Sequence, residues 1–248
     1  MILPNVRASF GASDVETLLQ LLEQRTRRSR LRWKGQLVEE GIDTLLDHPM
    51  TLSAVMENRS VSALSPKLAF YVMVRHTLLD GGLDNADIAD YVAALLVEFA
   101  EKERAFRIAR YDDKIYRYVV DLVSELEGES SERRQFLLRA HLGNYSLWLS
   151  GLFPDYVIAR VHRRGAPGLD YFEELGSSGF IMASECELAD RHDLVDIYQE
   201  VARGFRVVRR ALNRVSDRFF FPDSTSVDRL LRQAVDCVDH SAPGRADA

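Results

Sequence analysis

Cysteine, proline and glycine are all scarce in this chain of 248 residues, which has 2 cysteines, 7 prolines and 14 glycines. Two thiols cannot supply the disulfide framework of a small secreted protein, and a chain of this length can bury a core without one. Few prolines and glycines favour long helices, because these residues have the lowest helix propensities. Lysine is rare as well, and we attribute the excess of arginine over lysine to genomic base composition.

Long hydrophobic runs are also missing. The N-terminal MILPNVRASFGASD has no basic start followed by an apolar stretch, so the sequence predicts no signal peptide. The most apolar stretch, at 145–161, contains Pro154 and Asp155 and is too short to span a membrane. The formal net charge of −6 gives no overall attraction for nucleic acid or anionic lipid. We therefore expect a cytoplasmic protein that binds neither nucleic acid nor a membrane.

The motifs of common catalytic, metal and nucleotide sites do not occur. There is no Glu-x-x-His, no His-Glu-x-x-His and no glycine-rich phosphate loop. The spacing of Cys237 and His240 suits a metal ligand pair, but no second pair accompanies it. Gly176-Ser-Ser-Gly179 lies in a helical pattern, so we interpret it as a break or a point of close helix packing. The sequence therefore predicts no catalytic residue, no metal site and no cofactor, and it argues against an enzyme.

Apolar residues recur with the 3.6-residue period of an α-helix along almost the whole chain, and no segment alternates like a strand. We predict an all-α fold without a sheet, formed by a single compact multi-helix bundle of about eight to ten helices. The expected organisation is a flexible N-terminus over 1–12, one helical domain over 13–238 and a disordered tail over 239–248. Two glycines leave open whether residues 14–46 form one helix or two.

Two of the predicted helices organise this bundle. The helix at about 131–152 is apolar nearly all round, which is typical of a central helix that neighbours bury on every side. The helix at about 193–220 repeats apolar residues at alternating spacings of four and three, a pattern of near-parallel packing along a long partner. We expect that partner to be a helix of the same chain, at 131–152, at 85–107 or over a continuous 14–46. A symmetric dimer seam is the alternative.

Six polar residues in two apolar helices form the candidate ligand-binding set: Arg75, His76, Arg139, His141, Asn144 and Tyr145. Buried polar side chains need partners, since an unpaired one costs about 1–3 kcal/mol. The favoured interpretation is an internal hydrogen-bond network that links the two helices. The other interpretation is a polar pocket, in which arginine and histidine would pair with a small acid or a cofactor.

Two arginine-rich segments, at 25–34 and 203–218, could hold phosphate groups. Because the chain carries a net charge of −6, we expect these arginines to pair with acidic side chains at 98–132 instead.

Two classes of function remain. The preferred class is a non-catalytic protein-interaction or structural module, which binds a partner protein or a second copy of itself. The alternative is a helical bundle or enzyme that binds a small acidic ligand or cofactor in a polar pocket around His141.

Overall fold

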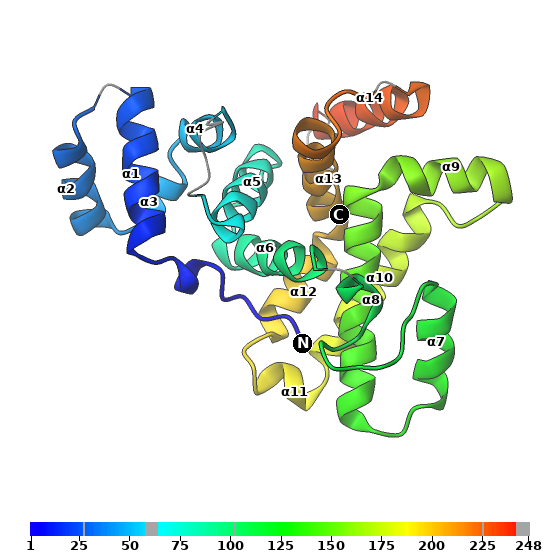
Figure 1. The fold of residues 1–248 in the computed structure, drawn as a ribbon. Helices are drawn as coiled ribbons and strands as arrows, with labels where there is room; N and C mark the ends of the chain where they lie inside the picture. Colours follow the sequence, from blue (N-terminus) through cyan, green and yellow to red (C-terminus); the bar gives the residue numbers. More distant parts are fainter. Residues whose placement is uncertain (27, 58–63, 102, 225, 242–248) are drawn as a thin grey trace, which may run out of the picture. The chain divides into compact units, whose positions relative to one another are not determined.

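The computed structural model describes residues 1–26, 28–57, 64–101, 103–224 and 226–241. The regular elements in these ranges are all helical and none is a strand, so the all-α prediction is confirmed (Figure 1). In the described ranges 12 α-helices have seven or more residues, which exceeds the expected number. The excess arises because residues 193–220, predicted as one helix, are divided, and because residues 14–46 contain two helices of this length.

Contacts between residues divide the chain into two compact units, which are described separately. Unit 1 comprises Met1–Asp80 and Asp84–Ile115, and unit 2 comprises Gly81–Leu83 and the chain from Tyr116 onwards. This division does not test the prediction of one helical domain over residues 13–238, which stays a prediction.

Unit 1 is built from six described α-helices. They are α1 (Ala12–Thr26), α2 (Arg30–Glu40), α3 (Asp43–Leu46), α4 (Thr51–Glu57), α5 (Pro66–Asp80) and α6 (Ala86–Phe99). Residues 14–46 thus form three helices. The second ends at Gly41, whose φ of 84° is a conformation that favours glycine. α5 packs against α6, and α1 packs against α4.

The core of unit 1 between α1 and α2 surrounds an indole ring. Trp33 is buried in a cluster with Leu19, Leu22 and Leu45. Its ring nitrogen donates a hydrogen bond to Thr26 Oγ1 at 3.2 Å. The aromatic residue of the first arginine-rich segment is therefore part of the hydrophobic core.

The N-terminal residues, expected to be flexible, contain two buried side chains in the structure. Ile2 and Val6 are both buried, and the backbone N–H of Arg7 donates to Asp90 Oδ1 at 2.8 Å. Burial raises the pKa of Asp90. Aliphatic burial and this hydrogen bond connect the segment to α6.

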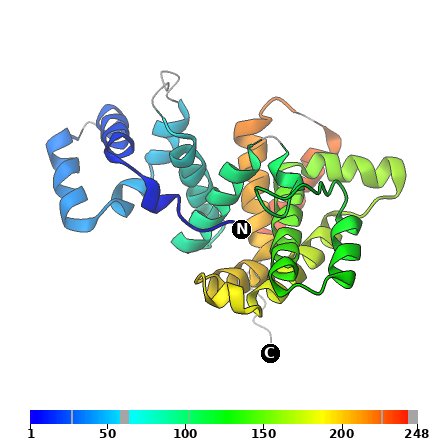
Figure 2. The same cartoon turned by 60° about the horizontal axis from the view of Figure 1, so that its bottom comes forward.

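Unit 2 contains the remaining α-helices of the described chain. They are α7 (Val119–Gly128), α8 (Glu132–Leu152), α9 (Pro154–Arg164), α10 (Leu169–Ser184), α11 (Glu187–Asp190), α12 (Val195–Arg203), α13 (Phe205–Val215) and α14 (Val227–Ser241). α8 packs against α7, α9, α10 and α13, and Figures 1 and 2 both show it beside α7. The prediction of a central helix at 131–152 is confirmed. α14 extends into the predicted tail, and residues 242–248 lie outside the described residues.

The repeating apolar seam of residues 193–220 is internal to unit 2. Seven of its eight members are buried, and the last, Phe219, is half-buried. The buried members are Leu194, Tyr198, Val201, Phe205, Val208, Leu212 and Val215. Gly204 divides the predicted helix into α12, which packs on α10, and α13, which packs on α8. Packing within the chain is confirmed, and α8 is one of the partners that we expected. The prediction of a single long partner was wrong, because the break at Gly204 lets α12 pack on α10, which was not among the expected helices.

α8 and α10 approach each other closely where both carry glycine. A Cβ atom built on Gly179 would lie 2.8 Å from the backbone nitrogen of Gly143 and 3.0 Å from the carbonyl oxygen of Arg139. A Cβ atom on Gly143 would lie 2.8 Å from the ring of Phe180, and one on Gly176 would lie 2.9 Å from Ser146 Cβ. The Gly176–Gly179 segment is therefore a point of close helix packing inside an unbroken helix.

The last carbonyl groups of α8 accept hydrogen bonds from two side chains at the end of α13 and directly after it. Asn213 Nδ2 donates to the carbonyl oxygens of Ser150 at 2.9 Å and Gly151 at 2.7 Å. Ser216 Oγ donates to the carbonyl oxygen of Leu152 at 2.7 Å. The carbonyls at the end of a helix have no partner within it. These bonds therefore allow α8 to end inside the protein.

Replacing Gly179 with alanine should destabilise the protein by about 1–3 kcal/mol, the usual cost of overpacking. The new methyl group meets the backbone of α8, which cannot rotate away as a side chain could. Urea unfolding followed by circular dichroism measures the change. Gly128→Ala is the control because a Cβ atom there meets nothing within 4 Å. Equal stability of Gly179→Ala and wild type would contradict the close contact.

Candidate ligand-binding site

The six residues predicted to form a site lie on one helix in each unit. Arg75 and His76 are on α5 in unit 1, whereas Arg139, His141, Asn144 and Tyr145 are on α8 in unit 2. The structure therefore defines no single site from all six.

In unit 1, Arg75 and His76 contact the segment that follows α3. Arg75 donates to both carboxylate oxygens of Asp47 at 2.9 and 2.7 Å, and to Asp84 at 2.6 Å. The hydrogen bonds with Asp47 and Asp84 raise the pKa of Arg75, although burial opposes this. His76 Nε2 lies 2.9 Å from the carbonyl oxygen of Leu46, and since a carbonyl can only accept, this nitrogen carries a proton. These contacts fit an internal network in unit 1.

On α8, three of the four predicted residues face the interior of unit 2. His141 and Asn144 are buried. Arg139 is half-buried and donates to Cys186 Sγ at 3.3 Å. Tyr145 differs because it lines a cavity, where its hydroxyl donates to the carbonyl oxygen of Arg117 at 3.3 Å.

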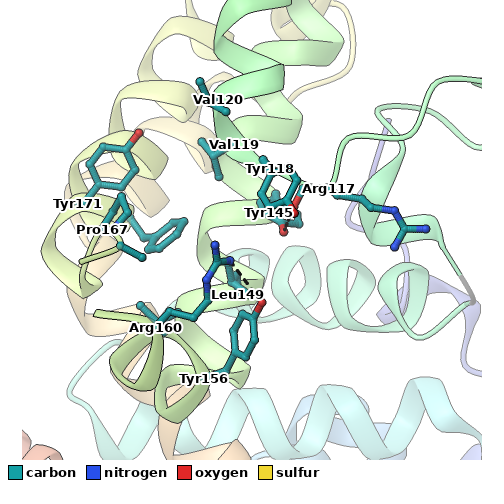
Figure 3. Close-up of a pocket in the computed structure, with 13 residues that line it drawn as sticks. Arg117, Tyr118, Val119, Val120, Tyr145, Leu149, Tyr156, Arg160, Pro167 and Tyr171 are labelled. Carbon is teal, nitrogen blue, oxygen red and sulfur yellow. Dashed lines mark hydrogen bonds between the residues drawn. The ribbon is translucent and has the colours of Figure 1, made fainter. Parts of the chain in front are cut away.

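The cavity has a volume of about 180 Å³ and is formed by α8, α9, the first turns of α7 and α10 and the segments that precede these two helices (Figure 3). Five aromatic side chains line it: Tyr118, Tyr145, Tyr156, Tyr171 and Phe172. Two arginines and aliphatic side chains complete the wall, and none of the 13 lining residues is acidic.

The ends of α9 position much of this wall. Pro154 starts α9 directly after the end of α8, with the fixed φ that suits the first helical residue. Gly165 ends α9 at a φ of 59°, in the left-handed region, and its N–H donates to the carbonyl oxygen of Val161 at 3.0 Å. The chain then turns through Ala166 and Pro167, which lie at the cavity.

The two arginines of the wall differ in direction. Figure 3 shows the Arg160 side chain extending into the cavity and the Arg117 side chain pointing away from it. Arg160 Nη1 donates to the Tyr156 hydroxyl at 3.3 Å, and its guanidinium carbon lies 5.6 Å from the centre of the Tyr156 ring. Arg160 Nε is buried without a hydrogen-bond partner. The cavity wall thus contains a guanidinium group whose hydrogen bond to the Tyr156 hydroxyl is long.

Tyr145 forms the part of the wall that α8 contributes. Burial raises the pKa of Tyr145 to about 12, so its hydroxyl keeps its proton at neutral pH. Its ring centre lies 5.8 Å from that of Trp148, which in turn lies 5.0 Å from Phe153. An indole therefore lies next to a residue of the cavity wall and can report on its occupation.

Sequence reasoning found Tyr145 and missed the other aromatic and cationic wall residues. Tyr118, Tyr156, Arg160 and Tyr171 belong to segments that only the fold brings together. The only signal available was the presence of a tyrosine near the start of α7, α9 and α10.

The two arginine-rich segments form ion pairs with acids outside residues 98–132. These pairs are Arg25–Glu57, Arg30–Glu16, Arg206–Glu173, Arg209–Glu173 and Arg210–Asp236. Among the acids at 98–132 that we expected as partners, Glu98 instead forms an ion pair with Arg104 at 2.9 Å. Internal pairing is confirmed for these arginines, but the predicted acidic partners were wrong, because proximity in the fold selects them.

Within the described ranges no group of three or more His, Cys, Asp and Glu side chains is placed to hold a metal ion. None of the helices described is both long enough and apolar enough to cross a membrane. Comparisons with protein-family models, with curated proteins and with solved structures find no match to this chain. The chemistry of the cavity therefore follows from its own geometry.

Acidification should destabilise unit 1 through His76. Burial lowers the pKa of His76 below its usual 6.5, so the folded protein keeps this ring neutral while the unfolded chain protonates it. Stability present above pH 6.5 is then lost as the pH falls below that value. Burial also lowers the pKa of His48 in the same unit, which adds to the loss.

A series of melting temperatures between about pH 7.5 and pH 5.5, the range in which histidine titrates, measures this loss. His76→Gln keeps a donor for the Leu46 carbonyl but cannot titrate. The melting temperature of this variant should therefore fall less with decreasing pH than that of wild type. His192→Gln, at an exposed position, is the matched control and should decline as wild type does. If His76→Gln declines as steeply as wild type, buried His76 is not the group responsible.

Proposed function

We propose that this protein binds a small aromatic acid in the cavity of unit 2 and does not catalyse a reaction on it. The observation that carries the proposal is the direction of Arg160, whose guanidinium extends into a cavity with five aromatic residues and no acid in its wall. The function is that of a ligand-binding helical protein.

The wall favours a flat, compact ligand. Aromatic rings attract one another when their centres are about 4.5–7 Å apart, and each such pair adds about 0.5–1.5 kcal/mol to the burial of its surface. The volume of about 180 Å³ is below the roughly 300–1,000 Å³ of cavities for drug-sized molecules. A molecule with a single ring suits this space.

The charge of the wall favours an anion. Among the described residues Arg160 forms no ion pair, and its buried Nε has no hydrogen-bond partner. A carboxylate can accept two parallel hydrogen bonds from one guanidinium group, which is a strong and directional interaction. The existing bond from Arg160 to Tyr156 is long, at 3.3 Å, so a carboxylate can compete for the same donors.

The side chains of the wall support binding over catalysis. The lining residues include no histidine, cysteine, serine or carboxylate that could act as a nucleophile or a general base. Tyr145 keeps its proton at neutral pH, because its pKa is raised to about 12, and so it does not repel an anion.

Isothermal titration with benzoate tests the proposal, with benzamide as a neutral ligand of the same shape. Benzoate should bind and quench or shift the fluorescence of Trp148 through Tyr145. Arg160→Gln should weaken benzoate by at least ~10-fold, since hydrogen bonds to charged groups contribute about 1.5–3 kcal/mol. Benzamide should bind to wild type more weakly than benzoate does. Its affinity for Arg160→Gln should equal its affinity for wild type.

The matched control is Arg163→Gln, which removes an exposed arginine from the same helix and outside the cavity wall. This variant should bind benzoate as wild type does. Absence of benzoate binding, or an equal loss in both arginine variants, would contradict the proposal.

A second candidate function is protein interaction. It is favoured by an exposed apolar surface on α14, which four aliphatic residues form: Val227, Leu230, Leu231 and Val235. This surface belongs to unit 2 and includes none of the residues that line the cavity.

A further inference from the structure

The helix α14 has its charged side turned inward. Arg229 and Arg232 are only 4% and 7% exposed. Arg229 Nε donates to Asp155 of α9 at 2.8 Å, and Arg232 Nη2 donates to Asp217 at 2.7 Å. A surface helix usually places its apolar side against the protein. Here buried ion pairs fix the opposite orientation.

The apolar side of α14 consequently faces outward. Val227, Leu230, Leu231 and Val235 are 72%, 56%, 62% and 58% exposed. Their spacing of three, one and four residues places them in one stripe along the helix. Contiguous apolar surface of this kind marks sites of interaction with other proteins.

We infer that α14 packs antiparallel against α14 of a second copy of this chain. A stripe with helical spacing complements a copy of itself, and a two-fold axis brings the same surface from both copies together. The antiparallel arrangement also opposes the dipoles of the two helices, so the positive end of each lies beside the negative end of the other.

The charges around α14 support this occupant and this direction. His162 Nε2 lies 3.7 Å from Asp228, so the end of α9 adjoins the first turn of α14. Arg163 and Arg164 follow there and are exposed. The C-terminal end of α14 has the negative end of the helix dipole. An antiparallel copy brings this end to the arginines, and the symmetry repeats the contact.

The size of the surface sets the strength of the dimer. A stable interface buries about 800 Å² on each partner, which is more than one face of a short helix provides. The dimer is therefore weak and in equilibrium with the monomer. Such an equilibrium shows as a mass that rises with protein concentration.

Sedimentation velocity of the full chain from about 1 to about 200 µM spans a micromolar dissociation constant and tests the inference. Wild type should shift from monomer to dimer over this range without any added ligand. Leu231→Glu should stay monomeric, with an unchanged circular dichroism spectrum because the side chain is exposed. Leu31→Glu is the matched control, since Leu31 is 82% exposed on α2 in unit 1, and it should dimerise as wild type does.

A charge reversal tests the direction of packing. Replacing Arg163 and Arg164 with glutamate should weaken the dimer by at least ~10-fold. A monomeric wild type at the highest concentration, or a dimer that survives Leu231→Glu, would overturn the inference. An unchanged dissociation constant after the charge reversal would overturn the antiparallel arrangement. The measurement involves no ligand, so its outcome is independent of the proposed function.

Discussion

The close approach of α8 and α10 at Gly143 and Gly179 is the contact on which the rest of unit 2 depends. It requires two residues without side chains at the same level of both helices, since a Cβ on Gly179 would meet the backbone of α8. Tyr145 follows Gly143 by two positions, so the same contact fixes the part of the cavity wall that α8 supplies. Asn213 and Ser216 donate hydrogen bonds to the last carbonyl oxygens of α8, so this helix can end inside the protein.

The polar groups of unit 2 serve two different purposes. Around α13 and α14 they satisfy one another: Glu173 accepts from Arg209 at 2.6 Å, and Asp217 accepts from Arg232 at 2.7 Å. Buried pairs of this type contribute little net stability but strongly favour one geometry, because a misplaced partner leaves a buried charge. Arg160 is different, since none of the residues that line its cavity is acidic and its hydrogen bond to the Tyr156 hydroxyl is long, at 3.3 Å. This contrast supports the proposal that Arg160 binds a ligand, whereas the arginines of α13 and α14 stabilise the fold.

The sequence was sufficient to predict the features that depend on local pattern. The all-round apolar character of 131–152 predicted a central helix, and the repeat of 193–220 predicted an internal seam. Gly176–Gly179 predicted either a helix break or close packing, and the structure has close packing. The sequence was not sufficient for features that depend on which segments meet. Tyr118, Tyr156 and Tyr171 line one cavity with Tyr145, but they lie in separate segments and no local pattern groups them. The sequence also did not predict that the apolar stripe of α14 is exposed, because an amphipathic pattern does not show which side of a helix faces the protein.

A crystal structure of the protein soaked with benzoate tests the central claim most directly. The account predicts benzoate in the cavity of unit 2, with its carboxylate about 2.7–2.9 Å from the guanidinium of Arg160, as in charge-assisted hydrogen bonds, and its ring against Tyr145. Benzoate bound elsewhere, or in the cavity with its carboxylate turned away from Arg160, would contradict the account.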